Sequence, residues 1–489
     1  MNLANWFKHP HEPFIYAALT VALTAGFGYG AFMVGTLAMG LIPGTWWGAL
    51  VQAHGHAQLF GWMGLFILGM GLYFLPRLRG VPLQSATRMP LAFGLLGAGI
   101  GLRVLAQPLL AWNFFGATAL PFWQILWLVS AALELAGIFV LGSMLVTSHR
   151  AAKPLIPTSP AYPIEPFLRI AVLSFSLAFL LNGLGIGYAV AQGKSTLATP
   201  FENLIITLMF YGVAVPMAIV FGTRTLPLFM RLAPPPRESL RLLARVYSVG
   251  LLLVLLPSLV PLTAMLFPST LFQNRVAEIS AALNLLWGIG SLALNLCILI
   301  FLWQLDLLRR RSSWVANRAA NTRPELDVLR KPTRANYPDS GEYGRFELLI
   351  YAAFAWLGLT VVLNLARVLG EFTDWFRVSP DTARHALAVG FVTLLICGMA
   401  ARMVPGFSHK KGLVYPQLVA VIFVVGNLAA LLRVIPTLFP NSEIALTLWG
   451  LSGIFGWMTI ALLAFNLVTT IRSNPAESPL PLSNLLHRG

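Results

Sequence analysis

The sequence predicts an all-α membrane protein of about twelve transmembrane helices, and three observations predict it. The chain has 489 residues, of which 57% are hydrophobic and 10% are charged, whereas a soluble domain carries about 25% charged residues. Its apolar runs are long enough for spans of roughly 20 residues. Its basic residues fall unequally on the two sides that twelve spans create. The formal charge of +16 therefore indicates membrane orientation, not a nucleic-acid partner.

The apolar runs place each helix in turn. We expect helices at about 14–37, 46–76, 89–107, 119–146, 167–191, 201–229, 242–266, 277–307, 345–370, 382–405, 412–435 and 443–471. Lys8 precedes a full-length first span without a cleavage signal, so we expect that span to stay in the protein. Cys297 and Cys397 both lie inside apolar runs, and neither a disulfide framework nor a thiolate metal cluster is expected.

The distribution of Lys and Arg predicts the topology. With both termini in the cytoplasm, 26 of the 33 basic residues face inward and 7 face outward, as the positive-inside rule requires. A bacterial inner-membrane protein with cytoplasmic termini is therefore expected. The one long polar stretch, 308–344, is interpreted as a basic cytoplasmic loop that rests on anionic lipid.

Helices two and ten share residues at one fixed spacing. Helix two contains HGHAQLFGWMGLFILGMGLYFLPRLRG, and helix ten contains RHALAVGFVTLLICGMAARMVPGFSHKKG. When His56 is aligned with His385, four further identities appear, all 329 positions apart: Gly61 with Gly390, Gly69 with Gly398, Met70 with Met399 and Pro76 with Pro405. These matches indicate an internal repeat.

Helix six carries a weaker third copy. With Thr207 at the histidine position, Gly212, Arg224 and Pro227 fall at offsets that helix ten also uses. The repeated helices are four apart in chain order, which predicts three four-helix arcs around a pseudo-threefold axis. We expect a single membrane domain over 1–489, with repeats at about 14–146, 167–307 and 345–471.

The matched histidines share a depth. His56 and His385 lie 20 residues before their prolines, roughly 30 Å from the inner face. An imidazole at that depth needs a partner, because an unsatisfied polar group in lipid costs several kcal/mol. A carbonyl or a serine could serve, but two matched histidines with His54 beside one of them favour metal ligation. His54 and His56 point about 200° apart around a helix, so they address different cavities.

Haem is the cofactor that these histidines favour. Thiolates are absent and carboxylates are scarce, which disfavours zinc, while imidazole pairs in apolar surroundings suit haem iron and leave copper as a second candidate. Haem propionates need cations, and four arginines lie near the outer ends of helices, against the positive-inside rule: Arg103, Arg367, Arg384 and Arg433. Snorkelling to the outer head groups is the alternative interpretation.

Other polar residues carry weaker signals. His9, His11 and Glu12 in the N-terminal KHPHEPF could bind copper on the cytoplasmic side. Glu134 is the acidic residue near the middle of a span, where a carboxylate either relays protons or is protonated and hydrogen-bonded. The remaining histidines fall in loops or tails: His149, His409 and His487.

Three stretches resemble the NnrS family: HPHEPF at the N-terminus, HGHAQLFGW on helix two and RHALAVGFVTLLICGMAARMVPG on helix ten. The pattern of twelve spans is similar as well. The resemblance implies a haem- and copper-containing membrane protein linked to nitric oxide and nitrosative-stress tolerance. It gives His56 and His385 the role of ligands to haem b.

The chain is more distantly similar to the catalytic subunit of haem-copper oxidases and nitric oxide reductases. That fold also has twelve helices in three arcs, with a haem between histidines of helices two and ten. Here Thr207 replaces the copper histidine of helix six, although Tyr211 stands four residues later, and helix seven has no histidine. An oxygen-reducing binuclear centre is therefore not expected.

Two functions remain as hypotheses. The first is a haem redox protein that handles nitric oxide or a related gaseous or anionic ligand, with an unidentified electron donor and with His54 on a second metal. It would then be a haem-dependent oxidoreductase. The second is a transporter for a small anion or a metal ion, which the repeats, the intramembrane arginines and Glu134 also fit. Lipid and haem are the expected partners, and the visible spectrum separates the two hypotheses.

Overall fold

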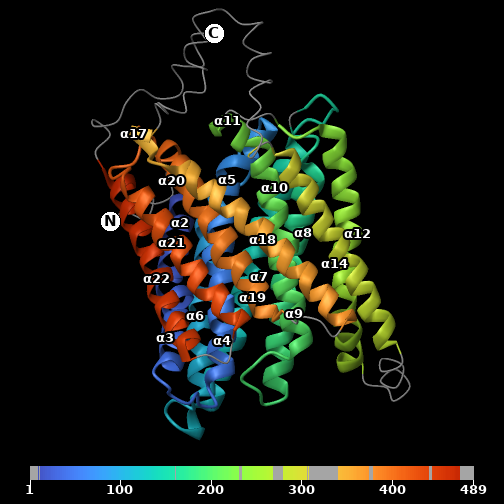
Figure 1. The fold of residues 1–489 in the computed structure, drawn as a ribbon, viewed down its shortest axis with the longest axis vertical. Coiled ribbons are helices and arrows are strands. Elements are labelled where there is room, and N and C mark those ends of the chain that lie inside the picture. The colour runs from blue at the N-terminus through green and yellow to red at the C-terminus, as the bar shows by residue number, and fades with distance from the viewer. Residues whose placement is uncertain are drawn as a thin grey trace, which may run out of the picture. The chain divides into compact units, whose positions relative to one another are not determined.

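The computed structural model describes residues 9, 11–159, 161–230, 234–267, 279–305, 307, 340–373, 378–439 and 443–473. Within these ranges the chain is helical (Figure 1), and twelve helices are long and apolar enough to cross a membrane. The prediction of an all-α protein with twelve membrane spans is therefore confirmed. Most of the predicted basic loop, 308–339, lies outside the described residues.

Several spans consist of more than one helical segment. The first six are α2–η1–α3 (His11–Ala38), α4–η2–α5 (Trp47–Arg79), η3–α6 (Ala86–Ala111), η4–α7 (Ala117–Ala151), α8 (Glu165–Ala191) and α9–η5–α10 (Thr199–Arg224). The last six are α12 (Arg237–Leu266), α14 (Ser280–Gln304), α18 (Phe346–Phe372), α19–η6–α20 (Pro380–Phe407), α21–η7 (Leu418–Leu438) and α22 (Glu443–Arg472). Two short helices, α11 (Leu226–Met230) and α17 (Ser340–Tyr343), lie between spans.

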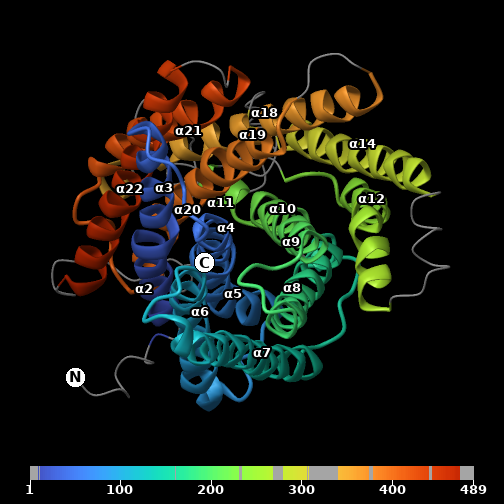
Figure 2. The ribbon, with the colours of Figure 1, turned by 90° about the horizontal axis from the view of Figure 1, so that it is seen from below.

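The chain divides into two compact units. Unit 1 comprises Met1–Phe93, Thr333–Thr360 and Ser379–Gly489, and unit 2 comprises Gly94–Pro332 and Val361–Val378. Within unit 1, α22 packs along both α21 and α3, and Figure 2 shows these three helices side by side. Within unit 2, α12 packs along α14.

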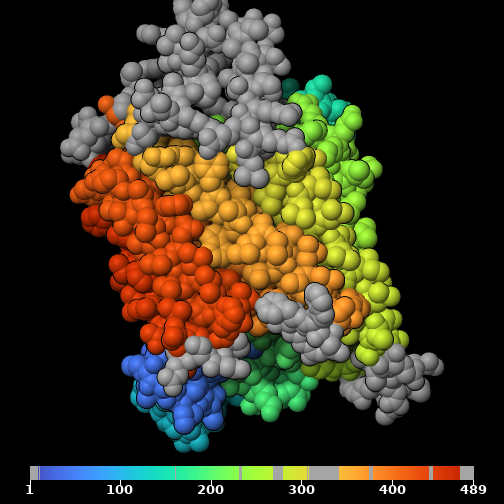
Figure 3. All heavy atoms as spheres, in the orientation of Figure 1, coloured from blue at the N-terminus to red at the C-terminus, as the bar shows by residue number. Residues whose placement is uncertain are grey.

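The surface of α21 and α22 fits contact with lipid. These helices form the orange-to-red face in Figure 3. Large apolar side chains on them are exposed: Val421, Val424, Leu431, Ile444, Leu451, Ile454 and Phe465. Such a surface would be costly in water, so it supports the membrane assignment.

The three helices of the predicted repeat are the most buried spans. In helices two, six and ten, 78% of the most apolar stretch is buried, against 28–56% in the other nine spans. Each of the three contains a π-helical segment: η2 (Ala57–Leu65), η5 (Leu208–Ala214) and η6 (Ala386–Thr393). These segments begin directly after His56, Thr207 and His385. The three copies therefore share a backbone irregularity at the aligned position.

The aligned glycines are explained by close packing on the preceding helix. A Cβ at Gly390 would overlap the indole of Trp356 on α18, and a Cβ at Gly212 would overlap the side chain of Ser174 on α8. Both glycines stand five residues after the aligned position. Only glycine leaves room for such an approach, which accounts for its recurrence in the repeat.

Candidate functional site

The predicted site residues are divided between the two units. Unit 1 contains His54, His56, His385, Arg384 and Arg433, and unit 2 contains Arg103 and Arg367.

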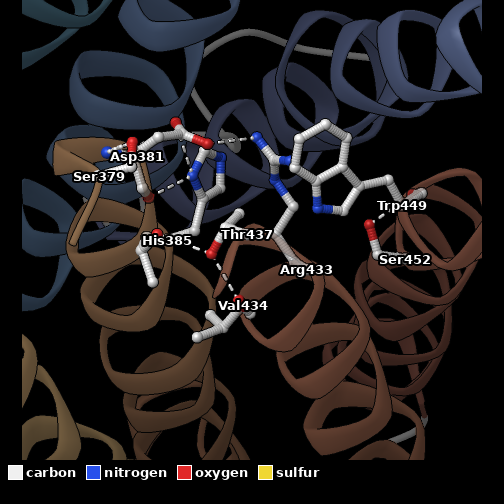
Figure 4. A network of polar contacts seen from close by, with 9 residues as sticks. Ser379, Asp381, His385, Arg433, Val434, Thr437, Trp449 and Ser452 are labelled. Carbon is white, nitrogen blue, oxygen red and sulfur yellow. Dashed lines mark hydrogen bonds and ion pairs between the residues drawn. The ribbon is translucent and has the colours of Figure 1, made fainter. Parts of the chain in front are cut away.

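In unit 1, Asp381 joins His385 to Arg433 (Figure 4). Nδ1 of His385, the last residue of α19 (Pro380–His385), lies 3.0 Å from Oδ1 of Asp381 and 3.0 Å from the carbonyl oxygen of the same residue. The second carboxylate oxygen accepts a hydrogen bond from Arg433 at 3.0 Å. Asp381 is held at the start of α19, where its N–H donates to Oγ of the N-cap Ser379 at 3.2 Å. Sequence reasoning missed this carboxylate.

Arg433, on α21 (Leu418–Val434), also contacts an indole. Its Cζ lies 5.2 Å from the centre of the ring of Trp449 on α22 (Figure 4). Nε1 of Trp449 is buried and has no hydrogen-bond partner in the described part of the chain. A hydrogen bond of 2.6 Å from Thr382 to Thr437 ties α19 to η7 (Ile435–Leu438), which follows α21. These contacts fix the guanidinium beside His385.

His54 and His56 both lie on α4 (Trp47–His56) and have different neighbours. Nδ1 of His54 lies 2.8 Å from the carbonyl oxygen of Gly26 in η1 (Ala22–Gly26). Gly30 makes room for this ring, because a Cβ there would come within 2.9 Å of Cε1 of His54. His56 is buried and stacks on Phe60, with ring centroids 4.4 Å apart.

Helices two and ten meet in unit 1 around these rings. His385, Arg433 and Asp381 are all close enough to His54 to act on it electrostatically. About two turns further into the helices, the indole N–H of Trp62 in η2 donates to Thr393 in η6 at 3.4 Å. The structure therefore brings His54 and His385 into one neighbourhood with a carboxylate and a guanidinium.

The hydrogen bonds assign the tautomer of two imidazoles. A carbonyl oxygen only accepts, so Nδ1 of His54 and Nδ1 of His385 must carry the proton. In the neutral imidazole, Nε2 of each ring then keeps its lone pair. Metal-binding histidines usually donate their other N–H to a carbonyl or a carboxylate in this way. Both rings are therefore set up to act as ligands or acceptors through Nε2.

Among the described residues, no group of three or more His, Cys, Asp or Glu side chains is arranged to hold a metal ion. This finding gives no support to copper held by protein ligands alone. Haem iron is less demanding, because the porphyrin supplies four ligands and the protein needs to supply one or two. A pair of histidines therefore suits haem better than a free ion.

In unit 2, Arg103 belongs to a separate polar network. Arg103 is buried and donates to Oε1 of Gln107, whose amide donates to the carbonyl of Ser195 at 2.9 Å. Glu134 is also buried and accepts a hydrogen bond of 3.0 Å from Asn182. This hydrogen bond satisfies one oxygen of Glu134 whether the carboxyl group is protonated or not. It is therefore compatible both with a proton relay and with a permanently protonated, hydrogen-bonded side chain.

The last predicted arginine, Arg367 of unit 2, lies with its Cζ 5.2 Å from the ring of Trp287. The N-terminal histidines form a further cluster in unit 1. The ring of His9 lies 6.0 Å from that of His11 and 5.1 Å from that of His409. Sequence reasoning had placed His409 in a loop without a role, since nothing in its spacing links it to the N-terminus.

Comparison with known families agrees with the resemblance seen in the sequence. A family model described as NnrS protein matches residues 344–473. The matched segment includes the helix-ten motif with Arg384 and His385, and also Asp381 and Arg433. Over these residues the similarity to the NnrS family is confirmed. A search of curated proteins found no match to the chain.

Proposed function

We propose that this chain is an NnrS-like haem b protein of the bacterial inner membrane that serves nitric oxide or nitrosative-stress metabolism. In this proposal His385 and a histidine of helix two bind haem in the outer half of the bilayer. One observation carries it: Nδ1 of both His385 and His54 is bonded to an oxygen acceptor, which leaves Nε2 available to iron. The similarity to the NnrS family supports it over residues 344–473.

The surrounding residues fit a haem. Arg433 and the half-buried Arg384 supply positive charge for propionates. The buried indole N–H of Trp449 has no acceptor among the described residues, and a carboxylate would provide one. The propionate role that the sequence suggests for Arg103 and Arg367 stays a prediction. The resemblance assigns the helix-two ligand to His56, and His54 is a second candidate because His385 acts on it electrostatically. Of His54 and His56, the one that does not bind haem could bind copper, and this stays a prediction.

Bound haem would supply an iron centre able to coordinate nitric oxide or a related small molecule and to change its oxidation state. The protein contributes the environment. Asp381 fixes the orientation of the His385 ring and increases its basicity through the bond to Nδ1. Buried apolar side chains such as Phe60 and Phe391 exclude water from the same helices. Redox turnover at this centre would make the protein a haem-dependent oxidoreductase.

The test is the visible spectrum of the full chain, purified in detergent after expression with a haem supply. We expect a Soret band that sharpens and shifts on reduction with dithionite, and a further shift when nitric oxide reaches the iron. His385→Ala should abolish haem binding, and so should alanine at one of His54 and His56. His149→Ala, at the exposed end of α7, is the matched control and should keep its haem.

A wild-type protein without a Soret band would refute the haem proposal. An unchanged spectrum for His385→Ala would remove that residue from the ligand set. If haem-free protein instead carried a small anion or a metal ion into liposomes, and Arg433→Gln abolished the uptake, the transporter hypothesis would take its place.

A further inference from the structure

Unit 2 contains a buried pair of N–H donors that lack an acceptor. Arg103 on α6 (Met89–Ala111) is 1% exposed and Trp127 on α7 (Leu120–Ala151) is 0% exposed. Their side chains are neighbours, with Cζ of Arg103 5.1 Å from the indole ring. Nε of Arg103 and Nε1 of Trp127 have no hydrogen-bond partner in the part of the chain that the structure describes. Two orphaned donors in one place indicate that a ligand is missing.

The charge of Arg103 points to an anionic ligand. Its hydrogen bond goes to the neutral amide of Gln107. The carboxylates of Glu134 and Glu202 act on the guanidinium through space, but neither provides the acceptor that Nε lacks. Arg433 in unit 1 differs, because Asp381 lies 3.0 Å from it. A buried guanidinium without a direct counter-ion is costly in a membrane, and a bound anion would offset that cost.

The position of the pair suits a ligand that enters from the loops. Arg103 stands eight residues before the end of α6, and Trp127 stands seven residues after the start of α7, so both lie about 10–12 Å inside the same end of these helices. One turn nearer to that end, Gln107 binds the carbonyl of Ser195 in the loop after α8. The neighbouring Lys194 is exposed and adds positive charge at this loop.

Helix packing limits the size of the ligand. One turn deeper than Arg103, Gly99 is pressed against α7, and a Cβ there would come within 2.9 Å of both the carbonyl oxygen of Ser130 and the backbone nitrogen of Glu134. The two helices are therefore in contact directly below the pair. A ligand of several ring atoms would have to separate them, whereas a single ion would not.

We propose that Arg103 and Trp127 bind a small inorganic anion, a halide or a compact oxyanion, which accepts from Nε–H and Nε1–H. This site depends on neither the histidines nor the proposed haem. A propionate carboxylate has the same chemistry, so the test must separate a free anion from a haem carboxylate.

The test uses bromide and the full chain in detergent with a chloride-free gluconate buffer. We expect anomalous diffraction from crystals soaked in bromide to place the ion between the two side chains. Calorimetric titration should show that Trp127→Phe, which keeps the ring and removes one donor, binds bromide about 10- to 100-fold more weakly. Arg103→Gln should abolish binding.

The matched control is Trp123→Phe, one turn away on α7. Its indole N–H already donates to the carbonyl of Phe114 at 2.9 Å, so this variant should bind bromide as the wild type does. Wild-type affinity in Trp127→Phe, or no bromide at the pair, would overturn the proposal even if Arg103→Gln failed to fold. Bromide that binds haem-free protein and disappears when haem is loaded would identify a haem carboxylate as the acceptor and would also overturn it.

Discussion

Replacing Asp381 by Asn should destabilise unit 1 and weaken the site around His385. The carboxylate makes two contacts of 3.0 Å, one with His385 and one with Arg433. The Asn side chain is nearly the same size, but it carries no charge and its amide nitrogen cannot accept from Arg433. The variant therefore removes charge and one acceptor while leaving the packing in place.

The exposure of the two partners sets the size of the effect. Removing one partner of a fully buried ion pair costs about 3–5 kcal/mol, and an exposed pair contributes about 0–1 kcal/mol. The side chain of Asp381 is 47% exposed and that of Arg433 is 17% exposed, so the pair lies between these limits. We expect Asp381→Asn to lower the free energy of unfolding by about 1–3 kcal/mol.

Unfolding of the detergent-solubilised protein, followed by tryptophan fluorescence, measures this effect. Glu371→Gln is the control, because Glu371 is exposed at the end of α18 and should change stability by less than about 0.5 kcal/mol. In haem-loaded protein, Asp381→Asn should also lower haem affinity about 10- to 100-fold. If Asp381→Asn and Glu371→Gln behaved alike in both assays, the linking role of Asp381 would be wrong.

Two further substitutions test the packing of the repeated helices. Gly390→Ala should lower the free energy of unfolding by about 1–3 kcal/mol because its Cβ would overlap an indole ring. Gly406, on the same span, has no atom within 4 Å of a Cβ added there. As the control, Gly406→Ala should therefore be neutral or slightly stabilising in a thermal melt. Tyr247→Phe should lower the free energy of unfolding by about 1 kcal/mol, since the phenol donates to the carbonyl oxygen of Tyr211 at 2.6 Å. Tyr188→Phe serves as its control. Equal melting temperatures for the two variants would show that this hydrogen bond does not stabilise the fold.

The spans could be predicted because length and hydropathy decide them. Their ends could not, since contacts between distant segments set these. The eleventh helix was predicted to begin near 412, but it begins at Leu418. The intervening backbone is held elsewhere: the N–H of Leu413 donates to the carbonyl of Glu342 at 2.7 Å, and Gly412 is packed against the same residue. The hydropathy of the sequence gives no sign of such a contact.

The histidines could be found in the sequence because they repeat at a fixed spacing from a proline. Asp381 was missed because a polar residue just outside an apolar run looks like an ordinary loop residue. A local signal does exist: Ser379 and Pro380 mark the start of a helix, and Asp381 then stands four residues before His385, on the same face. Trp127 and Trp449 gave no signal, since an indole in a membrane helix is normally only an apolar side chain.

The π-helical segments bear on how the histidine variants should be interpreted. Such segments often mark functional sites, and two of the three in the repeated helices directly follow a histidine. The third follows Thr207 and still begins at the aligned position, with Gly212 packed on Ser174 as Gly390 packs on Trp356. Because this copy keeps the irregular backbone and the glycine contact without an imidazole, both features serve helix packing in their own right.

It follows that His385→Ala should fold. The same reasoning extends to His56, whose π segment η2 should keep its geometry without the ring. We expect the free energy of unfolding of His385→Ala to lie within about 1 kcal/mol of that of the haem-free wild type. His56→Ala removes a buried ring and should lose about 2–4 kcal/mol while still folding. A missing Soret band would then report a lost ligand and not a lost fold. If His385→Ala failed to assemble while Gly390→Ala remained stable, the imidazole would be part of the packing, and the assignment of the π segments to packing alone would be wrong.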